Sequence, residues 1–347
     1  MMRSLARYGV ANAITRTMLS ELLTQEDFNE IVRAASIEEA WIVLRKTAYR
    51  DWLPEDVRPD PLAIEKELRE ATARRVKRAI RTLKGKPLEV ATILLSRWDL
   101  DNLEFAFRLW HGRDTSLEEF LTYPCFVHEI PVFEVTRAET IDEAALALRY
   151  TPYFEPVIAS AKTYKEKRSI FYVEMELEKD YYRRLLESIR ALGGADARKG
   201  ESIIASEIDI LNLSWLARLL HYYEVRTTEF HELMIPGPSA VSKQLASSDL
   251  TSDELDGLGS MFLLGKSGEE GKGLSNLERI SELEYIVREM AVDAARRLLA
   301  GYPFSITCIL SFYHLKRVEL GNLYTVFAGK ATDLAETEIT RRLYGLR

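Results

Sequence analysis

Long apolar runs and cysteine are both scarce in this sequence. No stretch approaches the roughly 18 uncharged apolar residues that a helix needs to cross a bilayer. The chain opens with two arginines, Arg3 and Arg7, but lacks the apolar core and small-residue cleavage site of a secretory signal. The two cysteines, Cys125 and Cys308, are too few and too isolated for a disulfide framework or a thiolate metal site. We therefore expect a soluble, cytoplasmic chain whose cysteines are buried.

Glycine and proline are also scarce, with 17 and 11 among 347 residues. Alanine, leucine, glutamate, arginine and lysine fill long windows, and windows of this composition favour helix. The best strand candidate, residues 126–133, contains Pro131 and is interpreted as an extended connector. The composition predicts an all-α protein. The length predicts two or three domains, because single cores stop growing near about 250 residues.

Positive charge is in deficit, with 47 lysines and arginines against 54 aspartates and glutamates, a formal net charge of −7. Neutralising phosphates needs a basic surface, so this balance argues against nucleic acid as the main partner. One exception is a basic stripe, defined as Arg74, Arg78 and Arg81, which recur at helical spacing. A solvated helix face explains such a stripe. The alternative is a docking face for an acidic partner or for lipid head groups.

Catalytic and metal-binding patterns are not recognisable. His128-Glu129 and His231-Glu232 begin like the helix of a zinc protease, but Val132 and Ile235 stand where the second histidine belongs. The many acidic residues cannot be paired across a cleft from the sequence, so no general acid or base is nominated. We expect no metal, no cofactor and no catalytic residue in this chain.

Gly265-Lys266-Ser267 resembles the end of a phosphate-binding loop. The first glycine of such a loop belongs at position 260, which is Ser260, and Gly259 is one residue out of register. Bulky apolar residues fill positions 261–264, and no strand precedes them, so the backbone cannot form the required cradle. We expect no direct nucleotide binding.

One short motif recurs three times at a constant interval. An acidic residue is followed three positions later by Asn-Leu, and the asparagines Asn102, Asn212 and Asn322 are each 110 residues from the next. An Asn near the boundary between two helices most often hydrogen-bonds local backbone. We interpret the three asparagines as structural repeat junctions. Each motif follows an apolar helical segment, at residues 90–95, 203–208 and 306–315.

A long charged segment and then a short break precede each motif, which predicts three helical hairpins. We divide the chain accordingly into repeat domains at residues 1–114, 115–226 and 227–347. Six glycines between residues 257 and 273 predict a mobile, Gly-rich loop in the third domain. The charged segments are 65–83, 171–192 and 277–299, and the breaks are Gly85-Lys86-Pro87, Gly193-Gly194 and Gly301-Tyr302-Pro303.

A further element, residues 37–49, recurs at residues 141–153 in the second domain only. The chain also opens with Tyr8-Gly9-Val10-Ala11-Asn12-Ala13 and carries Pro303-Phe304-Ser305-Ile306 before its last Asn-Leu motif. Together these motifs resemble the C subunit of the archaeal and bacterial V-type or A-type ATPase/ATP synthase, a family related to the d subunit of the eukaryotic vacuolar ATPase. The resemblance spans nearly the whole chain. The Gly-rich loop and Phe327-Ala328, where the first domain has Phe107-Arg108, depart from it.

The resemblance implies three similar helical domains around a pseudo-threefold axis, forming a funnel with a central cavity. It implies a non-catalytic rotor subunit, peripheral and monomeric within its complex, on the cytoplasmic side of the membrane. A rotor component of this kind connects the membrane ring of proteolipid subunits to the central-axle subunits and transmits torque for ATP synthesis or ion pumping. By hypothesis, the basic stripe contacts one of these partners.

The competing interpretation is a helical-repeat scaffold protein unrelated to rotary ATPases. Repeats of such scaffolds usually span roughly 34–47 residues, whereas the motif interval here is 110 residues. The long interval therefore favours three domain-sized units.

Overall fold

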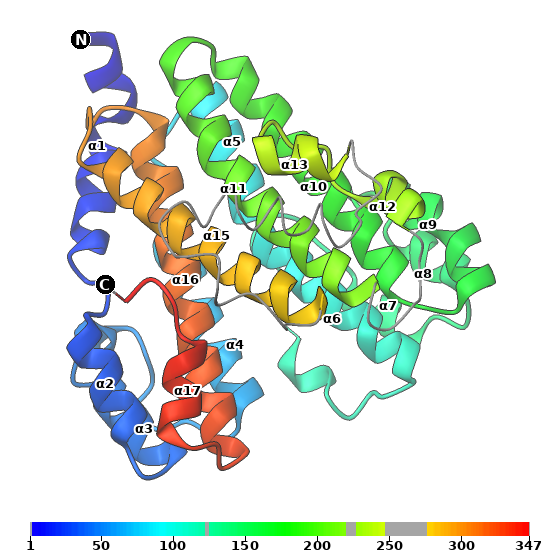
Figure 1. The fold of residues 1–347 in the computed structure, drawn as a ribbon, viewed down its shortest axis with the longest axis horizontal. Coiled ribbons are helices and arrows are strands. Elements are labelled where there is room, and N and C mark those ends of the chain that lie inside the picture. The colour runs from blue at the N-terminus through cyan, green and yellow to red at the C-terminus, as the bar shows by residue number, and fades with distance from the viewer. Residues whose placement is uncertain (1, 122–124, 220–226, 247–275, 347) are drawn as a thin grey trace.

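The computed structural model describes residues 2–121, 125–219, 227–246 and 276–346. This part of the chain consists of helices and short connections and contains no strand (Figure 1), so the all-α prediction is confirmed. None of its helices is both long enough and apolar enough to cross a membrane. The predicted Gly-rich loop at 257–273 lies outside the described residues.

Three long helical hairpins make up the body of the molecule, and their turns lie where the sequence predicts them. In the first hairpin, α4 (Pro61–Ile80) is followed by α5 (Lys86–Leu95) and α6 (Arg97–Gly112). The second pairs α10 (Phe171–Leu192) with α11 (Gly194–Arg218). The third pairs α15 (Asn276–Leu299) with α16 (Ile306–Ala331).

Local chemistry explains where these helices begin and end. Asp60 caps α4, because its carboxylate accepts hydrogen bonds from the amides of Leu62 and Ala63 at 2.9 and 3.0 Å. Pro61 follows at the first helical position, where its fixed φ suits the helix. Gly85 (φ +59°) and Gly193 (φ +71°) adopt the left-handed region that only glycine enters without strain. Both residues therefore separate the two arms of a hairpin.

The turns of the three hairpins meet at one end of the molecule (Figure 1). Nζ of Lys86 donates to the carbonyl of Ala191 at 2.7 Å and links the first turn to the second. Asp196 of α11 accepts from the phenol of Tyr8 in α1 (Met2–Leu19) at 2.7 Å and from the amide of Ile306 at 3.4 Å. We call this region the hairpin end and define it as residues 2–8, 81–87, 190–199 and 296–305.

Shorter helices connect the hairpins and pack on their sides. The elements α2 (Gln25–Arg33), α3 (Ile37–Leu44) and the 3-10 helix η1 (Ala48–Asp51) precede the first hairpin. Four elements join the first hairpin to the second, namely η2 (Glu118–Phe120), α7 (Val132–Arg137), α8 (Ile141–Ala147) and α9 (Phe154–Lys167). Then α12 (Thr227–Leu233) and α13 (Ala240–Leu245) follow the second hairpin, and α17 (Glu336–Arg342) follows the third.

The element that recurs in the sequence at 37–49 and 141–153 has the same local structure in both places. Ser36 and Thr140 cap α3 and α8, each accepting the amide of a glutamate three residues later at 3.2 Å. Each helix leads to a tyrosine with 0% exposure, Tyr49 and Tyr153. The sequence repeat therefore marks a repeated cap, helix and buried aromatic anchor.

The first and last helices of the chain share one hydrophobic core. Side chains of α2, α3 and η1 pack with Leu323 and Phe327 of α16. The rings of Trp41 and Phe327 meet edge to face, with centroids 6.3 Å apart. Figure 1 shows α2 and α3 beside α17 at the lower left. The beginning of the chain thus completes the packing around its last hairpin.

Candidate partner-binding cavity

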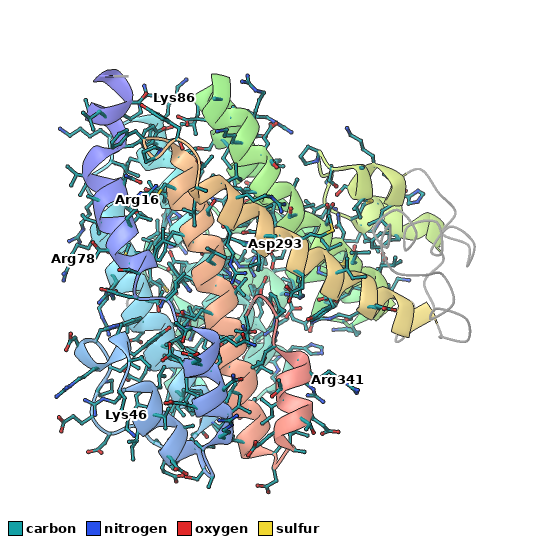
Figure 2. The ribbon with its side chains drawn as sticks, turned by 60° about the vertical axis from the view of Figure 1, so that its left-hand side comes forward. Arg16, Lys46, Arg78, Lys86, Asp293 and Arg341 are labelled. Atoms are coloured by element: carbon teal, nitrogen blue, oxygen red, sulfur yellow. The ribbon has the colours of Figure 1, made fainter. Side chains whose placement is uncertain are left out.

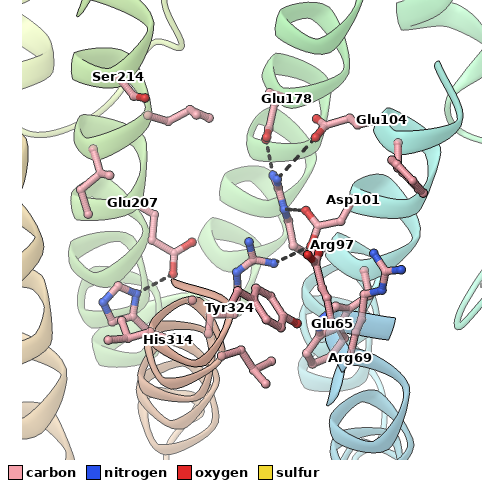
Figure 3. A pocket seen from close by; sticks show the side chains of 18 of the residues that line it. Glu65, Arg69, Arg97, Asp101, Glu104, Glu178, Glu207, Ser214, His314 and Tyr324 are labelled. Carbon is pink, nitrogen blue, oxygen red and sulfur yellow. Dashed lines mark hydrogen bonds and ion pairs between the residues drawn. The ribbon is translucent and has the colours of Figure 1, made fainter. Parts of the chain in front are cut away.

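A cavity of about 640 Å³ lies where α6, α11 and α16 converge (Figure 3). The three helices contribute residues at matching positions of the 110-residue repeat. Arg97, Glu207 and Arg317 form one such set of lining residues; a second is Asp101, Leu211 and Gly321, and a third is Glu104, Ser214 and Tyr324. The repeat that the sequence reveals therefore coincides with the lining of the cavity.

Arg97 is the centre of an ion-pair cluster on one wall of the cavity. Its guanidinium donates to Asp101 at 2.7 Å and to Glu178 of α10, and lies 4.0 Å from Glu104. Burial alone would lower the pKa of Arg97, but the three carboxylates outweigh it and raise that pKa well above its usual value. The arginine therefore stays charged and ties the two hairpins together.

Asp101 joins two hairpins through a second arginine. Nη1 of Arg317 in α16 donates to its other carboxylate oxygen at 2.9 Å. Burial raises the pKa of Asp101, yet Arg317 and Arg97 together lower it to about 2. The carboxylate is thus ionised throughout the physiological range. It links the first hairpin to the third at the cavity wall (Figure 3).

The opposite wall carries a second cross-hairpin pair. Nδ1 of His314 in α16 lies 2.9 Å from a carboxylate oxygen of Glu207 in α11. Burial raises the pKa of Glu207, but the hydrogen bond and charge of His314 outweigh it and lower that pKa. All three hairpins are therefore connected by polar contacts around the cavity.

Three buried polar atoms at the cavity have no hydrogen-bond partner within the described part of the chain. They are Nε of Arg69, Oε1 of Glu104 and Nε2 of His314, and each of these residues is 6% exposed. Burial, followed by the negative charge of Glu178, raises the pKa of Glu104 well above its usual value. Unpaired buried polar atoms are costly, so these three atoms are available to a polar group that enters the cavity.

The predicted repeat junctions lie away from this lining, within the helices. The boundary expected at Asn212 and Asn322 is not observed, since α11 and α16 run continuously through them. The side chain of Asn212 exchanges two hydrogen bonds with the backbone of Ile235, at 2.9 and 2.8 Å. Asn322 does the same with Tyr344, at 2.8 and 3.3 Å. The contact at Asn102 is to Sγ of Cys125 at 3.5 Å, so each asparagine holds a segment 22–23 residues downstream.

The acidic residue of each motif also fixes a distant segment, a role that sequence reasoning missed. Asp99 accepts the backbone amides of Phe126, Val127 and His128 at 2.5, 2.8 and 2.9 Å. The carboxylate of Asp209 accepts the hydroxyls of Ser239 and Ser242. Their recurrence at the same spacing as the asparagines was the signal that could have indicated this role.

Glu319, the third of these acids, binds the start of the chain. It accepts the amide of Leu23 at 2.5 Å and the phenol of Tyr49 at 2.6 Å. Lys316 donates to the same Glu319 oxygen at 2.5 Å and lies over the Tyr49 ring, 4.5 Å from its centroid. Glu319 thus connects the third hairpin to the first helices.

The basic stripe lies on the outer face of α4, remote from the cavity lining. Arg74 pairs with Glu70 at 3.3 Å. Arg78 and Arg81 are exposed, and no carboxylate in the described part of the chain pairs with either. Figure 2 shows Arg78 pointing away from the helices. Two of the three predicted arginines are therefore accessible to a partner.

The histidines do not assemble a metal site. The described residues contain no group of three or more His, Cys, Asp or Glu side chains that could hold an ion. Among them, burial lowers the pKa of His128, with a smaller contribution from Arg184. The Gly265-Lys266-Ser267 segment lies outside the described residues.

Comparison with known proteins identifies the family of this chain. The family model of the ATP synthase (C/AC39) subunit matches residues 11–342. The C subunit of the A-type ATP synthase of Archaeoglobus fulgidus is 26% identical over 345 residues, covering 95% of this chain and 94% of the relative. That of Pyrococcus horikoshii is 24% identical, covering 97% and 90%. That of Methanocaldococcus jannaschii is 23% identical, covering 100% and 88%.

These matches extend over nearly the whole chain, and they exclude the interpretation as a scaffold unrelated to rotary ATPases. The curated relatives are structural subunits of an enzyme complex and not its catalysts. The chain belongs to the ATP synthase (C/AC39) subunit family, and it is a non-catalytic subunit of a rotary ATPase.

Proposed function

We propose that this chain is the rotor subunit that connects the central-axle subunits to the membrane ring of proteolipid subunits. In that position it transmits torque between them, for ATP synthesis or for ion pumping. The observation that carries the proposal is the cavity, which matching positions of three repeated helices line in a member of this family. A hollow at the meeting point of three like units suits one central partner.

The proposal includes a pseudo-threefold arrangement of the domains 1–114, 115–226 and 227–347 around a funnel. Like units related by equal rotations close on themselves and leave a central hollow. Support comes from residues 97, 207 and 317, which line one cavity from three helices. The three hairpin turns at one end support the same arrangement.

A connector that carries torque must resist deformation between its parts. The ion pairs around the cavity cross from hairpin to hairpin, through Arg97 and Glu178, Arg317 and Asp101, and His314 and Glu207. Hydrogen-bonded networks in a medium of low dielectric constant are strong and rigid. The network is therefore suited to keep the three hairpins in register under load.

The axle end that enters the cavity should carry polar or charged groups. Arg69, Glu104 and His314 each offer an unpaired atom to such groups. A specific interface buries more than about 1,000 Å², so the contact must extend beyond the cavity onto neighbouring helices. We assign the exposed Arg78 and Arg81 of the basic stripe to a second contact, with an acidic surface of one of the two partners.

The proposal places the chain on the cytoplasmic side of the membrane, as a peripheral and monomeric member of the complex. It does not require a nucleotide, metal or cofactor on this chain.

Assembly tests the proposal directly. The purified chain is mixed with the detergent-solubilised ring and with the central-axle subunits, and co-elution is followed by size-exclusion chromatography. Simultaneous binding of both partners is expected. Failure to bind either would overturn the connector role. Charge reversal at Arg78 and Arg81 should weaken binding of one partner, and unchanged affinity for both would remove the stripe from the interface.

A further inference from the structure

The hairpin end concentrates exposed cations from all three hairpins. Lys84 follows α4, Arg198 and Lys199 lie near the start of α11, and Arg297 lies near the end of α15. All four side chains are exposed, and no carboxylate among the described residues pairs with any of them. Arg81 adds a fifth such cation. In Figure 2, Lys86 marks this end, and Lys46 and Arg341 lie toward the opposite one.

The acidic residues at this end are already occupied. Asp196 faces inward, where it accepts hydrogen bonds from Tyr8 and Ile306. Glu201, one helical turn farther along, pairs with Arg190 at 2.5 Å. Asp293, a turn before Arg297, lies 4.0 Å from Arg296. The cations without partners therefore leave a net positive surface on a chain whose formal charge is −7.

Stabilisation of helix ends does not account for these cations. A helix dipole favours cations at C-termini and disfavours them at N-termini. Lys86 is the first residue of α5, and Arg198 and Lys199 lie in the second turn of α11. At these positions the dipole offers a cation no benefit. Another interaction must therefore favour positive charge at this end.

Large apolar side chains are exposed among the cations. Leu5 of α1 is 51% exposed, and Tyr302 in the third turn is 45% exposed. The Tyr302 ring meets Phe304 edge to face, with centroids 5.8 Å apart. Tyrosine suits a boundary where one side is apolar and the other is wet.

We propose that the hairpin end binds the anionic head groups of a lipid bilayer. The cations come from three separate turns and spread over an end face, so a folded acidic partner would have to match several fixed positions. Lipid head groups diffuse and gather beneath scattered cations, while Leu5 and Tyr302 enter the interfacial layer. The inference rests on the proposed function in expecting a membrane nearby, and it adds the orientation of the chain, with its hairpin end toward the bilayer.

Vesicle binding by the intact chain tests this inference without any other subunit. The chain is sedimented with vesicles of phosphatidylcholine alone and of phosphatidylcholine with phosphatidylglycerol. Binding to the anionic vesicles only is expected, and it should weaken as added salt shortens the Debye length. Combined reversal of Lys84→Glu, Arg198→Glu and Lys199→Glu should lower the partition coefficient at least about 100-fold.

The matched control reverses three exposed cations at the other end, Lys46→Glu, Arg341→Glu and Arg342→Glu. It changes the net charge equally and should keep most of the binding. Thermal unfolding of each variant verifies that the fold is intact. Equal losses in both variants would overturn the inference, as would a wild-type chain that ignores anionic vesicles. An acidic protein that binds the hairpin end of such a chain would then be its partner. Because no ring or axle is present, these outcomes are independent of the assembly test.

Discussion

The phenol of Tyr49 donates a hydrogen bond of 2.6 Å to Glu319, which stands 270 residues later in the chain. Lys316 donates to both groups, at 3.0 Å to the phenol and at 2.5 Å to the carboxylate. All three residues are at most 5% exposed. This buried triad is the polar part of the joint between the first helices and the third hairpin.

Replacing Tyr49 by Phe should weaken that joint. The ring stays, but Glu319 and Lys316 each lose a hydrogen bond in a buried site, which should lower the free energy of unfolding by about 1–3 kcal/mol. Urea denaturation followed by circular dichroism measures the change. Tyr150→Phe is the matched control, since Tyr150 is 88% exposed and its loss should be negligible. Equal midpoints for the two variants would show that the triad contributes nothing.

Asn212→Ala should be more damaging than an ordinary surface substitution. The variant leaves the buried amide and carbonyl of Ile235 without their partners. Two unsatisfied groups predict a loss of about 2–4 kcal/mol. Asn29→Ala, at an exposed position on α2, should stay within about 0.5 kcal/mol of the wild type. A loss at Asn212 no larger than at Asn29 would contradict the role assigned to the asparagine.

Asp101 should contribute a defined part of the acid sensitivity. Its pKa in the folded state, about 2, lies below its usual value of 3.8 because Arg317 and Arg97 outweigh burial. Ionised Asp101 therefore stabilises the fold above about pH 4, and this contribution is lost as the pH falls toward 2. Asp101→Asn should cost about 2 kcal/mol at neutral pH and progressively less toward pH 2.

The measurement is the difference in urea midpoint between wild type and variant across that pH range. Asp142→Asn, at an exposed pair with Lys165, should change the midpoint little at any pH. A wild-type-to-variant difference at Asp101 that does not vary with pH would contradict the assignment.

Filling the cavity should block the proposed axle contact without unfolding the chain. Ser214 lines the cavity from α11, and Ser214→Trp places a large ring in the space of about 640 Å³. We expect axle binding to weaken at least about tenfold, since the loss of a well-packed central contact typically costs more than about 1 kcal/mol. Ring binding should be unchanged.

Ser202→Trp makes the same substitution on the same helix at an exposed position outside the cavity lining, and it should bind the axle normally. Co-elution titrations of both variants measure the effect. Normal axle binding by Ser214→Trp would show that the axle does not enter the cavity.

The hairpins were predictable from the sequence because their signals are local. Gly85 and Gly193 interrupt windows of strong helix formers, and the turns form there because glycine enters the left-handed region without strain. The repeat of 110 residues was equally visible, and it also marks the residues of the cavity lining. Which repeated positions face the cavity was not visible, since that depends on how three helices approach one another.

The joint at Glu319 was not predictable for a similar reason. Leu23 and Glu319 are 296 residues apart, and no local pattern pairs them. Lys316 stands where the first two repeats have Ser96 and Ser206, and a lysine in a helix is normally interpreted as solvated. Its ammonium is instead buried over Tyr49 and Trp52. The helix boundaries expected at Asn212 and Asn322 were wrong because these side chains bind backbone far along the chain rather than nearby.

The core shared by α2, α3 and α16 has a consequence for biosynthesis. A nascent chain releases α2 and α3 from the ribosome first, and their apolar faces have no permanent cover until α16 has been translated. The C-terminal third, expressed by itself, would in turn lack the helices that complete its core. Neither terminal unit is a self-sufficient module, so the protein can reach its finished form only after its two ends have met.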